Sequence, residues 1–163
     1  MKKTSKVFIA GHTGLIGSSI KRKLVEFSKS ETLDNGKPIT LSTNLDIPRA
    51  IENLRFFGSI VNNIESDAFP MENAGINYTL RQPLGVVGTI SPWNLPLYLF
   101  TWKIAPALMA GNTVLAKPSE ITPYTAYKLG EICVDANLPA GVLNIIHGQG
   151  ITAGDALINH KGV

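Results

Sequence analysis

Three short apolar runs, separated by helix-like segments, constrain the fold of this chain most strongly. The runs cover residues 84–90, 113–116 and 142–146. Continuous apolar runs of this length are typical of strands that are buried on both faces of a sheet. Helix-like segments lie between them, at residues 97–110 and 123–137. This order predicts an α/β fold with a parallel, Rossmann-like sheet that is flanked by helices and joined by right-handed crossovers.

The first half of the chain is less regular. Apolar residues between positions 46 and 64 follow a 3-4 spacing, which predicts an amphipathic helix. Asp46 is placed to cap this helix, with Pro48 in its first turn. Residues 77–81 alternate like an exposed strand. Residues 27–45 are rich in Ser, Thr, Asn and Asp, and we expect them to form a joint between two parts of the chain.

Composition removes several classes of function. The 163 residues carry a net charge of +3, but no basic run is interleaved with aromatic residues, so we expect no nucleic-acid binding. Lys103 interrupts the longest apolar stretch, so we expect no membrane span. The single cysteine, Cys133, excludes an intrachain disulfide and fits a reducing, cytoplasmic location. We expect no metal site.

A glycine motif near the N-terminus indicates a nucleotide-binding βα unit. GxxGxxG spans residues 11–17, after a strand-like run at residues 6–10 and before a helix that reaches about Val25. Such glycines let a helix N-terminus approach a pyrophosphate. The motif resembles the extended short-chain dehydrogenases, such as GDP-fucose synthase, and we assign residues 1–24 to this unit. That family's acidic residue should follow a second strand, whereas Asp34 follows a polar stretch.

Tyr124 and Lys128 match the Tyr-x-x-x-Lys pair of the same family, in which the lysine lowers the tyrosine pKa. Positions i and i+4 share one face of a helix, so the geometry is permitted. The chain has four tyrosines and many scattered lysines, so a tyrosine followed four positions later by a lysine arises easily by chance. We interpret the pair as a coincidence, and an extended short-chain dehydrogenase or epimerase is kept as an alternative function.

Four blocks in the rest of the chain resemble a different family. They are LDNGKP at 33–38, PLGVVGTISPWNLPL at 83–97, WKIAPALMAGNTVLAKPSEITP at 102–123 and LPAGVLNIIHGQGITAG at 138–154. In this order they resemble the aldehyde dehydrogenase superfamily over about residues 27–163. The stretches DIPRAIENLRFF and SPWNLPLYLFTWKIAPAL are most similar to its muconic semialdehyde dehydrogenase branch. We assign residues 25–163 to the N-terminal part of an incomplete aldehyde dehydrogenase coenzyme-binding domain.

The resemblance gives a role to the turn ISPWNLPL at residues 90–97. Pro92 and Pro96 fix φ at two points and make this turn stiff. From the residues alone, Asn94 either caps the following helix or presents a free amide. The resemblance implies that Asn94 donates its amide hydrogen to the oxyanion that forms when a thiolate attacks the aldehyde. Preorganised donors of this kind stabilise a transition state by roughly 3 kcal/mol.

The resemblance also implies contacts with a coenzyme. Lys117 and Glu120 match the family's adenosine-ribose contacts, because a carboxylate can accept hydrogen bonds from both ribose hydroxyls. From the residues alone, the alternative is a solvent-exposed turn pair, which contributes less than about 1 kcal/mol. The implied coenzyme is NAD rather than NADP, whose 2′-phosphate the carboxylate would repel. The other implied coenzyme contacts are Ser91, Pro92 and Trp93 on the nicotinamide side, and Gly150 and Gly154 at a helix start.

Two catalytic groups that the resemblance implies, a cysteine nucleophile and a glutamate general base, belong to segments beyond residue 163. Cys133 lies in a predicted apolar helix face, where a cysteine behaves as a small hydrophobe. We therefore expect a truncated or fused aldehyde dehydrogenase that is inactive alone. Its parent would oxidise an aldehyde, such as a muconic-type semialdehyde, with NAD. The parent is expected to be a homo-oligomer, and a non-catalytic nucleotide-binding remnant is the other alternative.

Overall fold

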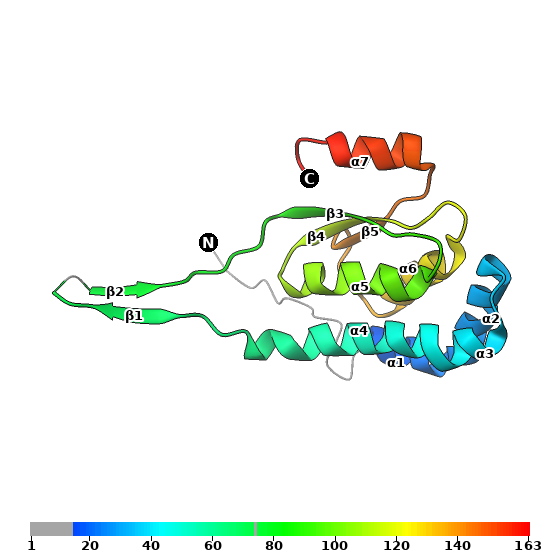
Figure 1. Ribbon diagram of the computed structural model, residues 1–163, viewed down its shortest axis with the longest axis horizontal. Helices are drawn as coiled ribbons and strands as arrows, with labels where there is room; N and C mark the ends of the chain where they lie inside the picture. The colour runs from blue at the N-terminus through cyan, green and yellow to red at the C-terminus, as the bar shows by residue number, and fades with distance from the viewer. Residues whose placement is uncertain (1–14, 74) are drawn as a thin grey trace.

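The computed structural model describes residues 15–73 and 75–163. The strand expected at residues 6–10 and most of the GxxGxxG motif lie outside the described residues. The described chain is an α/β fold in which helices and a small parallel sheet form layers, and a long hairpin projects from one end (Figure 1).

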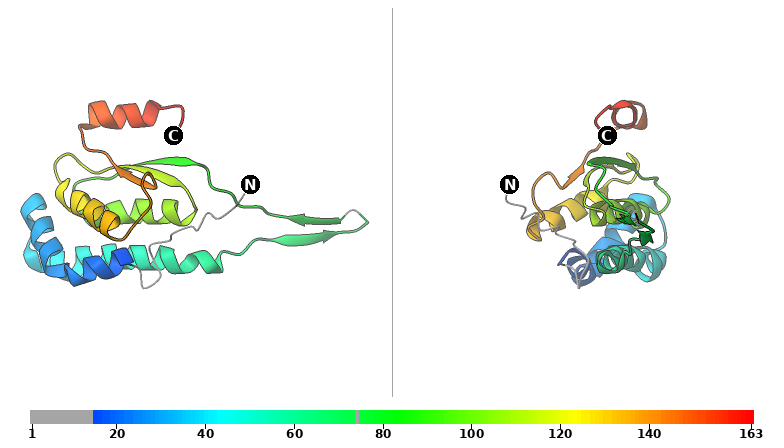
Figure 2. Two further views of the ribbon diagram at one scale, coloured as in Figure 1. Left: turned by 180° about the vertical axis from the view of Figure 1, so that it is seen from behind. Right: turned by 90° about the vertical axis from the view of Figure 1, so that its left-hand side faces the viewer.

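A three-stranded parallel sheet forms the centre of the fold. Strands β3 (Val86–Ile90), β4 (Thr113–Lys117) and β5 (Leu143–Ile145) are hydrogen-bonded in that order. Helices α5 (Pro96–Met109) and α6 (Tyr124–Asp135) connect them and cover one face (Figure 2). The parallel sheet and its flanking helices confirm the fold predicted from the three apolar runs.

The opposite face of the sheet carries much less structure. A π-helical turn, Gly150–Gly154, leads into the short helix α7 (Asp155–Asn159), which lies over β3 (Figures 1 and 2). Gly88 permits this close approach, because a Cβ there would lie 3.2 Å from the Leu157 side chain. Val86 and Ile90, which lie on the same face of β3 as Gly88, are nevertheless exposed. The expectation that β3 is buried on both faces was therefore wrong.

The N-terminal helices form a second layer behind α5 and α6. They are α1 (Leu15–Arg22), α2 (Leu24–Asn35), α3 (Ile39–Leu41), the π-helical turn Ser42–Asp46 and α4 (Ile47–Ile60), which ends in the 3-10 turn Val61–Asn63. The amphipathic helix predicted from position 46 is confirmed as α4. Its expected cap was wrong, because Asp46 has helical backbone angles and makes no capping hydrogen bond. Residues 27–45, expected to form a joint, are largely helical, and Phe27 packs into the apolar core.

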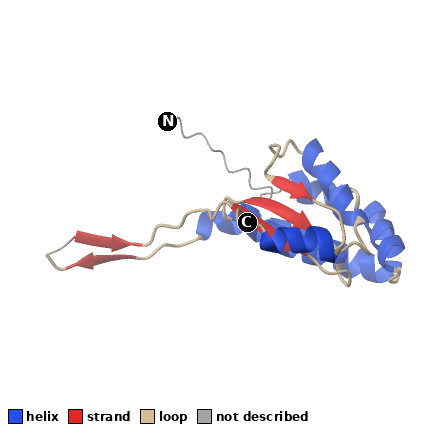
Figure 3. Ribbon diagram, turned by 90° about the horizontal axis from the view of Figure 1, so that it is seen from above, coloured by secondary structure: helices blue, strands red, loops and turns tan. Residues whose placement is uncertain are grey.

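The hairpin consists of β1 (Ala68–Met71) and β2 (Gly75–Tyr78), which pair antiparallel. It extends away from the helices and the parallel sheet (Figure 3). Every residue of both strands that the structure describes is exposed. The exposed strand expected at residues 77–81 is therefore present, but it starts and ends earlier in the chain.

One apolar core joins the sheet to both helical layers. It is formed by Phe27, Leu54, Leu97, Phe100, Ile104, Val114, Leu129 and Ile132, among others. Ile16 and Ile20 of α1 belong to the same core. The division of the chain at residue 24 stays a prediction. In the described part of the chain, no helix has the length and apolar character needed to cross a membrane.

Candidate functional site

The carboxyl ends of β3 and β4 bring together residues that are far apart in the sequence. The backbone N–H of Ser91, which follows β3, donates to the carbonyl of Lys117 at the end of β4 (3.0 Å). The Ile90 side chain lies close to the backbone of Gly154, since a Cβ on that glycine would be 3.9 Å away. Ligands of open α/β sheets bind at this edge of the strands.

Lys117, Glu120 and Gly150 form a chain of contacts at this edge. Lys117 Nζ donates to Glu120 Oε2 (3.0 Å) and to the Pro118 carbonyl (3.2 Å). Glu120 Oε1 accepts a hydrogen bond from the Gly150 backbone N–H (3.0 Å). The stem of Lys117 lies against Gly154, 3.7 Å from the position of a Cβ on that residue. Four of the predicted coenzyme contacts therefore lie together.

The two charges of this pair differ in their exposure to solvent. The Lys117 side chain is 2% exposed, whereas that of Glu120 is 44% exposed. Hydrogen bonds from its own backbone N–H, from Lys117 and from the Gly150 N–H lower the pKa of Glu120 to about 2. Glu120 is therefore ionised at neutral pH, with its negative charge fixed in place and open to solvent.

Ser91, Pro92 and Trp93 follow β3 directly and lie at the same edge. Ser91 is buried, and its hydroxyl has no hydrogen-bond partner among the described residues. Buried hydroxyls are normally hydrogen-bonded, so such an atom at a strand end is a candidate ligand contact. Pro92 and Trp93 are exposed. Lys103 of α5 donates to the Ile90 carbonyl and thereby fixes the start of this turn.

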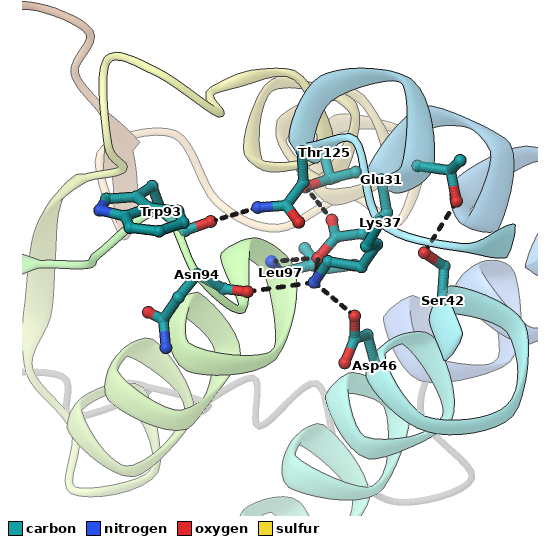
Figure 4. A network of polar contacts seen from close by, with 10 residues as sticks. Glu31, Lys37, Ser42, Asp46, Trp93, Asn94, Leu97 and Thr125 are labelled. Atoms are coloured by element: carbon teal, nitrogen blue, oxygen red, sulfur yellow. Dashed lines mark hydrogen bonds and ion pairs between the residues drawn. The ribbon is translucent and has the colours of Figure 1, made fainter. Parts of the chain in front are cut away.

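Asn94 does not cap the following helix. Helix α5 begins at Pro96, its N-cap residue is Leu95, and no side chain makes a capping hydrogen bond there. The exposed Asn94 side chain points away from the neighbouring polar network (Figure 4). Within the described residues, its amide makes no hydrogen bond. The amide is therefore free to donate to a ligand at the end of β3.

Three residues that the sequence did not suggest as site residues contact the backbone of this turn. They are Glu31 and Asn35 of α2 and Lys37 of the loop after it. Figure 4 shows Glu31 and Lys37 beside the turn. Asn35 and Lys37 lie in the block LDNGKP, so the family resemblance marked the segment without assigning a role to either side chain.

The surroundings of Cys133 and of the Tyr124–Lys128 pair are typical of residues with a structural role. Cys133 is buried in α6, and burial raises the pKa of its thiol to about 12. Lys128 forms an ion pair with Glu26, which raises the pKa of Lys128, and its ammonium lies 5.3 Å from the centre of the Tyr124 ring. In the described residues, no group of three or more His, Cys, Asp or Glu side chains is arranged to hold a metal ion.

Comparison with known proteins places these residues in a family. The sequence profile of the aldehyde dehydrogenase family matches residues 14–163. The 2-aminomuconic semialdehyde dehydrogenase of Danio rerio is 52% identical over 145 residues, which are 88% of this chain and 30% of that protein. The 2-hydroxymuconic semialdehyde dehydrogenase of Pseudomonas sp. (strain CF600) is 46% identical over 153 residues, which are 91% of this chain and 32% of that protein.

Solved structures show the same likeness. The NAD+ complex of an aldehyde dehydrogenase from Bacillus cereus matches with a TM-score of 0.91 and 33% identity. That match covers 100% of this chain and 33% of the solved chain. The chain therefore spans about a third of the length of the proteins that it resembles.

Proposed function

The chain belongs to the aldehyde dehydrogenase family, and we propose that it forms the coenzyme-contacting part of an NAD-dependent semialdehyde dehydrogenase and carries the oxyanion donor. One observation carries this proposal. Hydrogen bonds join Lys117, Glu120 and Gly150 at the strand edge where the free amide of Asn94 also lies. The similar proteins named for muconic semialdehydes support a muconic-type semialdehyde as the substrate.

The residues at the strand ends fit NAD. The ionised carboxylate of Glu120 is partly exposed and can accept hydrogen bonds from two adjacent ribose hydroxyls. The unpartnered Ser91 hydroxyl offers a further polar contact, and the similar NAD+ complex supports this choice of coenzyme. NAD supplies the hydride acceptor when it is bound. The charge of Glu120 would repel the additional phosphate of NADP, so we propose that NAD is preferred.

Asn94 is proposed to stabilise the oxyanion that develops on the aldehyde oxygen. Its amide is a neutral donor that makes no competing hydrogen bond within the described residues, so no bond has to break before it donates. A donor that is already fixed in position costs no reorganisation during the reaction and contributes roughly 3 kcal/mol. Pro92 and Pro96 on either side restrict the backbone that carries it.

We propose that these residues do not supply the nucleophile. A thiolate is the reactive form of cysteine, and the raised pKa of Cys133 keeps its thiol protonated at neutral pH. We therefore propose that the 163-residue chain alone does not oxidise aldehydes. The parent is further proposed to be a homo-oligomer, since exposed residues of the hairpin such as Phe69 and Tyr78 offer an apolar surface and open strand edges. A cytoplasmic location is proposed because the single cysteine fits a reducing compartment.

One experiment with two readouts tests this proposal. Purified chain is titrated with NAD by calorimetry and is then mixed with NAD and a muconic-type semialdehyde while NADH absorbance is followed. We expect saturable NAD binding and no NADH above a blank without protein. Absence of NAD binding would overturn the coenzyme assignment. Turnover that is lost in Cys133→Ser would show a working nucleophile, and turnover lost only in Tyr124→Phe would favour a short-chain dehydrogenase.

A further inference from the structure

Two buried charged side chains hold the backbone of the turn that carries Asn94 (Figure 4). Lys37 Nζ donates to the Asn94 carbonyl (3.1 Å), and the Leu97 backbone N–H donates to Glu31 Oε1 (3.3 Å). The Glu31 side chain is fully buried and that of Lys37 is nearly so. Lys and Glu are almost never buried without partners, because removing a charge from water is costly. Their placement against an uncharged turn therefore needs an explanation.

The same two side chains are anchored on their far side. Lys37 Nζ forms an ion pair with Asp46 Oδ2 (2.5 Å) and lies 3.9 Å from Glu31 Oε1. Thr125 Oγ1 of α6 donates to Glu31 Oε2 (2.8 Å). The cluster thus connects α2, the π-helical turn before α4 and the start of α6 to the turn. Lys37 and Glu31 thus each contact both the turn and the rest of the fold, so displacement of the turn would remove the hydrogen bonds that these two buried charged groups make to its backbone.

A third contact comes from Asn35. Its Nδ2 donates to the Trp93 carbonyl (2.7 Å). Gly36 follows in a left-handed conformation (φ 79°), and its N–H donates to the Thr32 carbonyl, which ends α2. This chain reversal lets Asn35 and the buried Lys37 reach the same turn from one short segment.

Helix α5 begins at Pro96, and this determines which backbone N–H first needs a hydrogen-bond partner. The first N–H groups of a helix have no partner within the helix, and a negative charge near them is favourable. Pro96 has no N–H, so Leu97 presents the first one of α5, and the Glu31 carboxylate accepts it. The turn is therefore fixed at Leu97 as well as at the Trp93 and Asn94 carbonyls.

We propose that Glu31, Asn35 and Lys37 are positioning residues that hold the backbone at Asn94 in place, so that its side-chain amide is presented from a fixed position. The proposal rests on the proposed function in giving Asn94 its role as oxyanion donor. The exposed amide makes no hydrogen bond of its own within the described residues, so the backbone that carries it sets where it lies. Fixed geometry is what makes such a donor effective.

Nuclear magnetic resonance of chain labelled with nitrogen-15 asparagine tests the proposal, with Asn94→Ala used to assign the Asn94 backbone amide. The variants are Lys37→Met, which removes the ammonium, and Asn35→Ala, which leaves the buried charges intact. Lys128→Met is the matched control, because it breaks the Lys128–Glu26 ion pair away from the turn.

We expect the order parameter of the Asn94 backbone amide to fall from about 0.85 to below about 0.6 in Lys37→Met, and to fall less in Asn35→Ala. The backbone amide of Asn112, which donates to the Ala107 carbonyl (3.2 Å), serves as an internal reference and should not change. The control Lys128→Met should leave both amides as they are.

Asn35→Ala decides the matter if Lys37→Met does not fold. An Asn94 backbone amide that stays as ordered in Asn35→Ala as in the unaltered chain would overturn the proposal. A parallel loss of order at Asn112 in Asn35→Ala would also overturn it, since this would show a general effect on stability. The measurement needs neither coenzyme nor aldehyde. A loosened turn in a chain that does not bind NAD would therefore refute the proposed function and leave the positioning role standing.

Discussion

The two faces of the parallel sheet differ in how completely they are covered. Beneath α5 and α6, Val114 and Ala116 of β4 are fully buried and join the core of the second helical layer. On the other face, the five-residue helix α7 buries Leu157 against β3 and leaves Ile158 exposed. A groove of about 670 Å³ lies between β3 and α7.

The two regions therefore differ in role: the covered face supports the fold, and the exposed strand ends carry the groups proposed to bind a ligand. The covered side supplies the packing and the buried hydrogen bonds that hold the turn after β3 in place, among them those of Glu31 and Lys37. The candidate ligand groups, such as the Glu120 carboxylate and the Asn94 amide, are exposed at the strand ends. Substitutions on the covered face should therefore act mainly on stability, and those at the strand ends mainly on binding.

Core truncation should give the largest effect. Phe100 of α5 is fully buried, so Phe100→Ala should lower the free energy of unfolding by about 3 to 5 kcal/mol. Ile158→Ala on α7 should change it by less than about 0.5 kcal/mol, because this side chain is exposed. Urea unfolding followed by circular dichroism measures both. Similar losses in the two variants would contradict the difference between the faces.

The reactivity of Cys133 reports on the covered face without a substitution. A thiol with a pKa of about 12 instead of 9.0 carries about a thousandfold less thiolate at pH 8. Alkylation by iodoacetamide should therefore be about a thousandfold slower in the folded chain than in urea. Mass spectrometry gives both rates. Equal rates would mean that α6 does not shield this residue.

The contributions of Glu31 and Glu120 to the free energy of unfolding should depend on pH in opposite directions. Burial raises the pKa of Glu31 above 4.5, so the folded state binds a proton more tightly than the unfolded state does. Its contribution to the free energy of unfolding therefore falls as pH rises from 4.5 through the raised pKa. The lowered pKa of Glu120 gives stability that is present above 4.5 and is lost as pH falls towards about 2.

Glu31→Gln isolates the first of these effects, because glutamine keeps an acceptor for the Leu97 N–H and cannot ionise. Melting temperatures are measured from acidic to neutral pH. The melting temperature of the variant should rise relative to that of the unaltered chain as pH increases above 4.5. A variant that instead loses stability relative to the unaltered chain over this range would contradict the assignment.

Local patterns predicted the sheet and much of the candidate site. Apolar runs are a property of neighbouring residues, and they correctly indicated β3, β4 and β5 and their parallel order. The family blocks pointed to Lys117, Glu120 and Gly150, which the fold brings into contact, although their roles in coenzyme binding stay a proposal.

Local patterns failed where the partners are distant. The polar composition of residues 27–45 suggested a joint, yet the buried Ser28 and Ser30 satisfy their hydroxyls on carbonyls one helical turn earlier. Glu31 finds its partners at Leu97 and Thr125, which are 66 and 94 positions away. A carboxylate with such partners has the same appearance in the sequence as one on a solvated surface.

The central claim is that Glu120, held by Lys117 and the Gly150 N–H, recognises the adenosine ribose of NAD. Calorimetric titration of the chain with NAD and with NADP tests it most directly. Glu120→Gln keeps the size of the side chain and an oxygen acceptor but removes the charge, and Glu131→Gln on the exposed side of α6 is the control. We predict tighter binding of NAD than of NADP by the unaltered chain, a narrower preference in Glu120→Gln and no change in Glu131→Gln. Equal affinity of the unaltered chain for the two coenzymes would contradict the claim.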